Sequence, residues 1–234
     1  MRLLVTRPEE GGARSAAALR ANGHEVLLAP LLRIEAVTGA DLGAPPWSAV
    51  LLSSANAVRA IAGHPRIHEL TKLPALAVGE RTAQAARAAG FADVQSADGD
   101  AHDLSRLATV RFAGSRSPLL YLAGEERARD LTDDNGALPL RTVVVYRAVK
   151  VLSLPPRVQE ALALNRLDGV LHFSLRSAEA YVACSRTAGL LDKALALVQF
   201  CLSPRVAGAL VGASRVRIAA RPDEAALLDL VEAR

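Results

Sequence analysis

The sequence predicts an α/β fold with two similar α/β domains, each built on a mainly parallel sheet covered by helices. Three repeats carry this prediction. Residues 49–58 are echoed by residues 169–178, residues 77–83 by residues 201–207, and residues 3–30 by residues 119–146. In the first two repeats, a short apolar run ends at small polar or glycine residues and a helical pattern follows. This order is typical of a strand that leads directly into a helix.

The third repeat is a short β-α-β unit. Residues 3–6 read as a buried strand, which the glycine pair at 11 and 12 helps to break. A helix is expected over residues 13–21, ended by Asn22-Gly23, and a strand over residues 25–30. A crossover of this length favours parallel pairing. The second copy is expected to have a strand at 119–122, a helix at 128–133, a turn at Asn135-Gly136 and a strand at 142–146.

Further helices are predicted where apolar residues recur at helical spacing. The expected spans are 55–61, 82–89 and 101–107, and in the second half 176–183, 205–211 and 223–231. Ser54 and Ser174 stand directly before two of these helices. Neither lies in the G-x-S-x-G setting of a hydrolase nucleophile, so we expect both to cap their helices. Capping and ligand binding can coexist there, because both use the same helix N-terminus.

Two extended segments, 31–37 and 147–152, are natural crossing points between the domains. Each follows a predicted strand and is rich in residues that favour extended structure. If the chain crosses at both, residues 1–35 and 150–234 form one discontinuous domain, and residues 38–147 form an inserted one. We therefore expect a two-stranded linker and a relative orientation that varies in the free protein.

The composition favours an aliphatic core and an anionic small-molecule ligand. The chain has 234 residues, of which 51% are hydrophobic and 3% aromatic, and its net charge is +4. Most of the positive charge is arginine, which reflects either an arginine-rich genome or the binding of carboxylates or phosphates. The arginines are dispersed along the chain and aromatics are few. Both observations argue against a nucleic-acid binder.

The cysteines and the N-terminus indicate the compartment. Cys184 and Cys201 lie in apolar contexts without a C-x-x-C spacing, which is typical of reduced, buried thiols. Arg7 follows the first apolar run too soon for a signal peptide. No apolar run approaches the roughly 18 residues of a membrane span. We therefore expect a soluble cytoplasmic protein without a membrane partner.

Metal and nucleotide sites have little support in the sequence. His64 and His68 have a zinc-ligand spacing, but Pro65 follows the first of them and no Glu or Cys completes a set. Residues 79–82 do not form the G-x-G-x-x-G fingerprint of a dinucleotide site, and residues 122–125 lack the GK[ST] of a P-loop.

The strand ends are the candidate binding site. Where a strand ends and a helix begins, the first backbone N–H groups have no internal partner and the helix dipole is positive. Several such ends would suit a ligand with several negative charges. Tyr146 ends an apolar strand near a predicted crossing point. It is either a buried ring with a satisfied hydroxyl or a phenol that donates a proton to the ligand.

Seven short motifs together resemble the uroporphyrinogen-III synthase family over essentially the whole chain. They are Val5-Thr6-Arg7-Pro8, residues 51–58, residues 77–83, Val144-Val145-Tyr146, His172-Phe173-Ser174, Leu202-Ser203-Pro204 and Ala220-Arg221-Pro222. The resemblance implies two α/β domains joined by a two-stranded ladder, with the active site in the cleft between them. The order of the motifs is more specific than any one of them.

The resemblance also implies an enzyme of tetrapyrrole and heme biosynthesis. Its substrate would be hydroxymethylbilane, a linear tetrapyrrole with eight carboxylates. The reaction would be a lyase-type ring closure with inversion of the last pyrrole ring, giving uroporphyrinogen III. The resemblance implies no metal or organic cofactor, and we expect a monomer. The alternative is a non-catalytic two-domain protein that binds an anionic small molecule.

The helix ends and the resemblance together predict the site residues. Tyr146 is the expected catalytic residue. The expected substrate contacts are Thr6, Arg7, Ser53, Ser54, Ala55, Asn56, Gly79, Arg81, Thr82, Gly124, Ser174, Arg176 and Ser203. The chain departs from the family pattern in two places. Ser203-Pro204-Arg205-Val206 lacks the Gly and Thr often found there, and residues 133–139 look altered.

Overall fold

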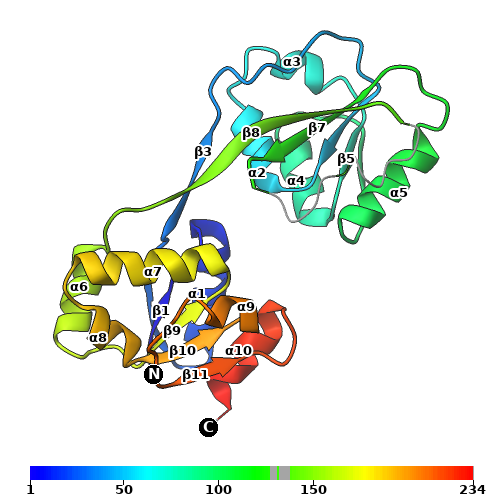
Figure 1. Cartoon of the computed structure of the whole chain (residues 1–234). Coiled ribbons are helices and arrows are strands. Elements are labelled where there is room, and N and C mark those ends of the chain that lie inside the picture. The colour runs from blue at the N-terminus through cyan, green and yellow to red at the C-terminus, as the bar shows by residue number, and fades with distance from the viewer. Residues whose placement is uncertain (127–130, 132–137, 234) are drawn as a thin grey trace. The chain divides into compact units, whose positions relative to one another are not determined.

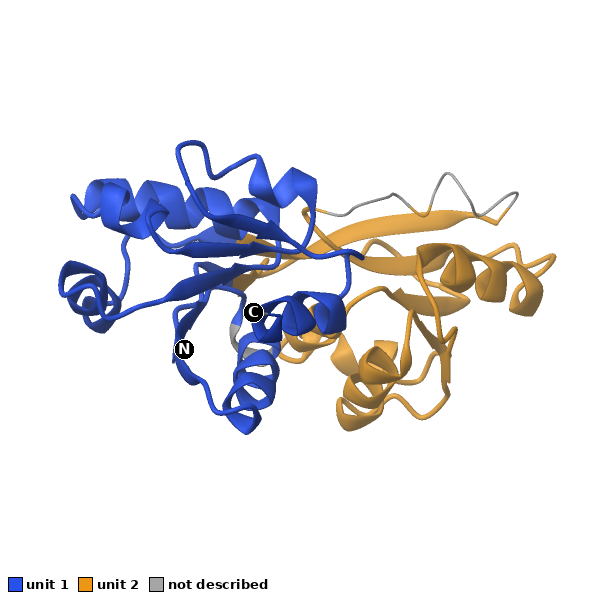
Figure 2. Cartoon of the chain, turned by 90° about the horizontal axis from the view of Figure 1, so that it is seen from below, with its two compact units in different colours: residues 1–33, 149–234 blue, residues 34–148 orange. Residues whose placement is uncertain are grey.

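The chain divides into two compact units. The computed structural model describes residues 1–126, 131 and 138–233. Unit 1 comprises residues 1–33 and 149–234, and unit 2 comprises residues 34–148 (Figure 2). The chain passes between them within strands β3 (Leu32–Ala36) and β8 (Leu140–Lys150), which are paired with one another. The amide of Val37 donates to the carbonyl oxygen of Val145 (2.8 Å), and that of Val151 to Leu31 (3.1 Å), which is an antiparallel register.

The sheet of unit 1 is parallel throughout and runs in the order β11-β10-β9-β1-β2 (Figure 1). Its strands are β1 (Arg2–Val5), β2 (Glu25–Leu28), β9 (Gly169–His172), β10 (Val198–Cys201) and β11 (Val216–Ile218). From β1 the chain proceeds to one side, and from β9 to the other. The carboxyl ends of β1 and β9 therefore form a topological switch point, which is where open α/β sheets bind ligands.

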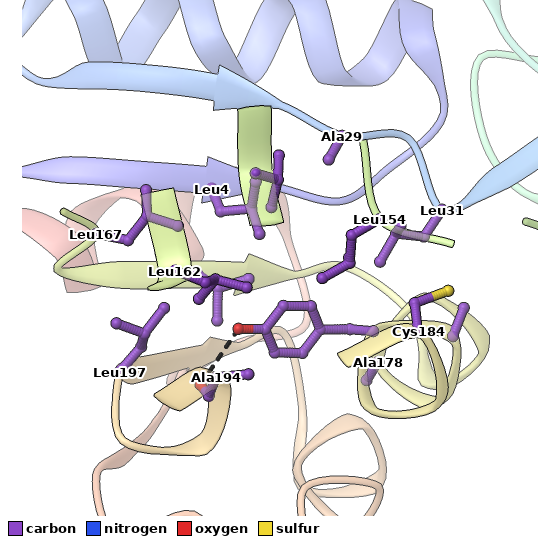
Figure 3. Close-up of a cluster of buried hydrophobic side chains, with 14 of the residues drawn as sticks. Leu4, Ala29, Leu31, Leu154, Leu162, Leu167, Ala178, Cys184, Ala194 and Leu197 are labelled. Carbon is purple, nitrogen blue, oxygen red and sulfur yellow. Dashed lines mark hydrogen bonds between the residues drawn. The ribbon is translucent and has the colours of Figure 1, made fainter. Parts of the chain in front are cut away.

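Both faces of this sheet are covered by helices. Alternate residues of β1 point to opposite faces. Leu3 and Val5 pack with α1 (Glu9–Ala21) and α10 (Glu224–Glu232). Leu4 packs into the core that covers the other face, which Figure 3 shows. The helices there are α6 (Pro156–Ala163), α7 (Leu175–Thr187), α8 (Leu191–Leu195) and α9 (Pro204–Ala207). In this core the hydroxyl of Tyr181 donates to the carbonyl oxygen of Ala194 (3.2 Å; Figure 3).

Unit 2 repeats this arrangement, with β3 added at one edge. Its strands β4 (Ala49–Leu52), β5 (Ala75–Ala77), β6 (Val94–Ser96) and β7 (Leu119–Gly124) join β3 and β8 in the order β3-β8-β7-β4-β5-β6. The order β8-β7-β4-β5-β6 is parallel and matches β2-β1-β9-β10-β11 of unit 1. The switch point of unit 2 therefore lies at the carboxyl ends of β7 and β4.

Helices also cover both faces of the sheet in unit 2. One core contains side chains of α2 (Ala55–Ile61), α3 (Ile67–Leu70) and α4 (Glu80–Ala88), packed on Val50 and Leu52. The other contains side chains of α5 (Ala101–Arg111), packed on Ala49 and Leu51. The prediction of a mixed α/β fold with mainly parallel sheets is confirmed.

Four predicted helix boundaries were wrong. Helices α5 and α7 extend to Arg111 and Thr187, beyond the predicted ends at residues 107 and 183. Helix α1 begins at Glu9, so the glycine pair lies inside the helix and does not end the preceding strand. Helix α9 ends at Ala207, not at residue 211. The short elements α3, α6, α8, β6 and β11 were not predicted from the sequence. The predicted helix at 128–133 and the turn at Asn135-Gly136 fall outside the described residues, apart from residue 131.

The helices in the described part of the chain are short. The longest helices, α1 and α7, have 13 residues each. In the described ranges, every helix falls short of the length and hydrophobicity of a membrane span.

Candidate active site

Helices α2, α4, α7 and α9 each begin within a few residues of the carboxyl end of a strand. Ser54, Ser174 and Ser203 are N-cap residues, and the capping predicted for the first two is confirmed. Their hydroxyl oxygens accept hydrogen bonds from the amides of Asn56 (3.2 Å), Ser177 (3.2 Å) and Val206 (3.4 Å), respectively. The chain thus presents first-turn amides at two adjacent strands of each sheet, as an anion site needs.

Helix α4 starts without a side-chain cap. Gly79 is its N-cap residue, and a Cβ atom there would have no neighbour within 4 Å. The backbone at this turn is therefore open. Arg81 lies exposed in the first turn of α4, whereas Thr82 is 6% exposed. Of these two predicted contacts, Arg81 has the more accessible side chain.

At the switch point of unit 1, Thr6 and Arg7 follow β1. Thr6 is fully buried, and its hydroxyl donates to the carbonyl oxygen of Leu171 in β9 (3.0 Å). Its side chain therefore serves the pairing of the two strands. Arg7 reaches across to the residue before Ser174, because its guanidinium carbon lies 4.3 Å from the ring centroid of Phe173. Arg176 is half-buried in the first turn of α7.

Arg7 is also paired with an acidic residue from the last helix. Its Nη1 atom lies 2.9 Å from Oε2 of Glu224 and donates to the hydroxyl of Ser15 (3.2 Å). Ser15 is fully buried, and its hydroxyl donates to Oε1 of Glu224 (2.6 Å). Burial raises the pKa of Glu224, but the hydrogen bond from Ser15 and the positive charge of Arg7 outweigh this effect. The pKa of this carboxyl is therefore below its ordinary value.

The arginine explains a glycine in helix α1. A Cβ atom on Gly11 would lie 2.4 Å from Nε of Arg7 and 2.7 Å from its Cζ. Gly11 therefore leaves the space that the guanidinium occupies. The guanidinium is paired there with Glu224 of the last helix, a contact between distant residues, which is why the glycine pair was misread as a break.

The switch point of unit 2 is built from hydroxyl groups. Ser53, which follows β4, has its Oγ atom 2.8 Å from the hydroxyl of Tyr121 in β7. Tyr121 is 2% exposed, so the Ser53 hydroxyl is hydrogen-bonded to the hydroxyl of a buried side chain. Ser54 and Ala55 follow at the start of α2. The side-chain oxygen of Asn56 accepts a hydrogen bond from Arg59 (2.9 Å).

Tyr146 and Gly124 face one another in the ladder between β7 and β8. The register shifts there, between Ala123 and Gly124. A Cβ atom on Gly124 would lie 2.7 Å from Cζ of Tyr146 and 2.9 Å from its hydroxyl oxygen. The ring therefore lies against the glycine backbone and is half-buried. Within the described part of the chain, the Tyr146 hydroxyl makes no hydrogen bond. The observed ring differs from the fully buried, satisfied phenol that the sequence left open.

Comparison with known proteins identifies the family. The family model of uroporphyrinogen-III synthase (HemD) matches residues 13–229. The chain belongs to the uroporphyrinogen-III synthase family. It is an enzyme of heme biosynthesis of the lyase type, and it cyclises hydroxymethylbilane to uroporphyrinogen III. A search of curated proteins found no match.

Solved structures of two uroporphyrinogen-III synthases share the fold. The protein from Helicobacter pylori superposes with a TM-score of 0.63 at 19% identity, over 99% of each chain. A mutant of the Thermus thermophilus protein gives a TM-score of 0.50 at 17% identity, over 99% of this chain and 96% of that one. At these identities the likeness supports the fold alone.

The departure from the family pattern at residues 203–206 has a structural account. In this synthase Pro204 is the first residue of α9, where its missing N–H costs no helical hydrogen bond. Val206 replaces the Thr often found in the family, and it is 4% exposed within the core of unit 1. An apolar side chain suits that position. The sequence around residues 133–139 lies outside the described residues, except for 138 and 139.

A buried histidine, for which the sequence predicted no role, lies at the switch point of unit 1. His172 ends β9, and its Nε2 atom lies 3.0 Å from Oε1 of Gln199. The amide nitrogen of Gln199 donates to Ala194 (2.9 Å) and Leu197 (3.0 Å), so its oxygen accepts and Nε2 of His172 carries the proton. Burial lowers the pKa of His172 to about 4, so the ring is neutral at pH 7.

Metal ligands do not cluster in the described residues. No three His, Cys, Asp or Glu side chains come together there as a metal site would require. A surface hollow of about 330 Å³, lined by Arg2, Arg20 and His24, lies where β1 and β2 begin. The hollow therefore lies at the amino ends of the strands, whereas the switch point lies at their carboxyl ends.

Proposed function

We propose that this synthase closes hydroxymethylbilane by holding its carboxylates at the switch points of its two sheets. The observation that carries this proposal is the repeated placement of helix N-termini at the carboxyl ends of adjacent strands. Eight carboxylates need many anchors, and first-turn amides provide them without reactive side chains. The proposed anchors are the amides around Ser53 to Asn56, Gly79 to Thr82, Ser174 to Arg176 and Ser203, together with Arg7 and Gly124. The fully buried Thr6 supports them by joining β1 to β9.

In this proposal, the enzyme selects the inverted isomer by positioning the substrate. Uncatalysed closure takes the simpler route to the uninverted isomer, in which the far pyrrole attacks through its free carbon. Inversion requires attack through the substituted carbon, which gives a spiro intermediate that fragments and closes again. An enzyme that holds the substrate in a bent conformation favours attack through the substituted carbon over attack through the free carbon. The domains that would hold it are residues 1–35 with 150–234, and residues 38–147, linked by β3 and β8.

Tyr146 is the proposed proton donor. Loss of the substrate hydroxyl needs a proton and leaves a cationic azafulvene. A phenol carries its proton at neutral pH, so it can donate directly or through a water molecule. The half-buried ring of Tyr146, held against the backbone of Gly124, supports this role because its hydroxyl has a fixed place beside the switch point of unit 2.

An isomer assay tests the function. The protein is incubated with hydroxymethylbilane, the products are oxidised, and the porphyrin isomers are separated by chromatography. We expect the inverted isomer to dominate, whereas a control without protein gives the uninverted one. A protein that binds the substrate but leaves the isomer ratio of the control unchanged would be the alternative, a non-catalytic binding protein.

We further propose a cytoplasmic monomer that has no nucleic-acid partner and works without a metal or organic cofactor. Cys184 and Cys201 are buried and unpaired, which suits a reducing compartment. Burial raises the pKa of Cys201 to about 12, so this thiol is unreactive. Light scattering across a concentration series measures the mass, and a value of twice 24.6 kDa would contradict the monomer.

A further inference from the structure

We infer that Glu224 is an internal carboxylate that competes with the substrate for Arg7 and thereby sets the carboxylate affinity of the switch point in unit 1. This inference rests on the proposed function, because it assigns Arg7 to a substrate carboxylate. It names Glu224 as an affinity-determining residue that need not touch the reacting atoms.

The surroundings of Glu224 form a complete carboxylate-binding site. One oxygen accepts a hydrogen bond from the buried Ser15 (2.6 Å), and the other lies 2.9 Å from Arg7 and 3.9 Å from Arg14. A hydroxyl and a guanidinium group are what a bound carboxylate needs. In the structure, a carboxylate of the protein itself fills this site.

Glu224 is free for this role because its neighbour caps the helix. Asp223 is the N-cap residue of α10, and its carboxylate accepts a hydrogen bond from the amide of Ala226 (2.8 Å). The helix start therefore does not depend on the side chain of Glu224. The first-turn position still favours a negative charge, but it does not require the contact with Arg7.

The pair lies where a substrate carboxylate is expected. Arg7 follows β1 and stacks on Phe173, the residue before the cap of α7. The side chains of Arg7 and Glu224 are 22% and 35% exposed, so an incoming anion can reach the guanidinium from solvent. Ion pairs that remain partly solvated contribute little to folding stability. Replacing Glu224 by a substrate carboxylate at Arg7 therefore costs little free energy. Glu224 competes with the substrate for the guanidinium.

Replacing Glu224 by Gln isolates this competition. The glutamine keeps the size of the side chain and can still accept the hydrogen bond from Ser15, but it no longer neutralises Arg7. We expect KM for hydroxymethylbilane to fall roughly three- to tenfold at low salt, with kcat nearly unchanged, because a charged pair is worth a few fold in affinity.

Two control proteins separate this effect from the general loss of a negative charge. Glu25→Gln removes the same charge from an exposed pair with Arg2 (3.3 Å) at the opposite edge of the sheet. Its KM should change less than about twofold, because solvent screens a charge at this distance. In an Arg7→Gln background, Glu224→Gln should no longer lower KM, because the guanidinium is gone.

Equilibrium binding provides a readout that does not need turnover. Uroporphyrin III, a stable octacarboxylate, is titrated into each variant and followed by its fluorescence. Tighter binding by Glu224→Gln than by Glu25→Gln, lost in the Arg7→Gln background, supports the inference. Equal binding by the two single variants, or the same gain without Arg7, overturns it.

The isomer assay on the wild-type protein keeps the two proposals apart. A wild-type protein that forms only the uninverted isomer refutes the proposed function, while the porphyrin titration still decides the role of Glu224. Thermal unfolding of every variant is recorded first. If Glu224→Gln does not fold, Glu224→Asp is titrated instead. Its shorter carboxylate retracts from Arg7 and should also bind the porphyrin more tightly than wild type, and weaker or equal binding overturns the inference.

Discussion

In unit 1 an arginine and a glutamate meet at the switch point, whereas in unit 2 a serine hydroxyl meets a buried tyrosine. Both units use the same strand order and the same kind of capped helix at this edge. The fold thus supplies first-turn amides in both places, and the side chains around them differ. The comparison suggests that unit 1 adjusts affinity for carboxylates, while unit 2 holds the phenol proposed to act in the reaction.

The difference originates at a few equivalent positions. Phe173 in unit 1 stands where Ser53 stands in the repeat of unit 2. Asp100 caps α5 and Asp223 caps α10, but the next residue is Ala101 in one helix and Glu224 in the other. Several differences at equivalent positions of a shared framework thus accompany the different charge of the two sites.

The largest expected effect tests the catalytic role of unit 2. Tyr146→Phe keeps the ring against Gly124 and removes only the hydroxyl. We expect kcat to fall by about 10²–10⁴, the usual range for a general acid, while folding and uroporphyrin III binding stay nearly intact. Turnover with isomer analysis measures both quantities. Wild-type turnover would assign Tyr146 to packing, and a larger share of uninverted isomer would assign it to positioning.

Gly124→Ala sharpens the same test. The added methyl would lie 2.7 Å from the ring carbon that bears the hydroxyl, so the ring must move. We expect kcat to fall by about 10- to 100-fold, on the scale of a misplaced catalytic group. In a Tyr146→Phe background the same change should have little further effect. A full additional loss there would show that Gly124 acts independently of the phenol.

Removal of a single amide tests the anchors. Ala55 is the first residue of α2 and follows Ser54 in an extended conformation, a position that tolerates proline. Ala55→Pro deletes one N–H and should weaken kcat/KM by about 10- to 100-fold, because a hydrogen bond to a charged group contributes about 1.5–3 kcal/mol. Glu80→Pro makes the same change at the first residue of α4, whose amide is another proposed anchor, and should weaken kcat/KM to a similar extent. Wild-type kinetics in both variants would exclude these amides as anchors.

The stability of unit 1 should depend on pH through His172, whose place in the repeat is taken by Leu52 in unit 2. The pKa of His172 is lowered from 6.5 to about 4. Between these values the unfolded chain binds more protons, so stability is complete above pH 6.5 and falls as the pH decreases toward 4. The expected loss is about 3 kcal/mol.

Urea unfolding at pH 7 and pH 5 should show about 2 kcal/mol of this loss, because the rest appears only as the pH approaches 4. His172→Leu introduces the residue of unit 2 and should reduce the difference between the two pH values. The exposed His68 is the matched control, and His68→Leu should leave the difference unchanged. An equal pH dependence in wild type and His172→Leu would exclude His172 as its source.

The smallest effects are expected from the cap residues themselves. Ser54→Ala and Ser174→Ala each remove one side-chain acceptor but leave the backbone amides in place. Each should cost about 1 kcal/mol of stability and only a few fold in kcat/KM. Thermal unfolding and steady-state kinetics check the pair together. Loss of activity from Ser54→Ala alone would point to a side-chain mechanism in unit 2.

Local sequence was sufficient for features that depend on near neighbours. The strand, cap and helix around Ser54 could be read directly, and helix α2 has the predicted bounds because its cap and apolar spacing lie within a few residues. The repeats likewise predicted the α/β class, since alternating strands and helices leave few other ways to bury apolar faces. Short elements such as α3 and α8 were missed, because one turn has too little periodicity to stand out.

The sequence by itself determined the class of fold, the family motifs and the capped strand ends, because these are written in contiguous residues. Only the tertiary structure decided which distant groups meet. The ion pair between Arg7 and Glu224 depends on α1 and α10 packing on the same face of the sheet. The contact of Tyr146 with Gly124 depends on the register of two strands. Such contacts follow from the burial of whole elements, and no short window of sequence contains the information that sets them.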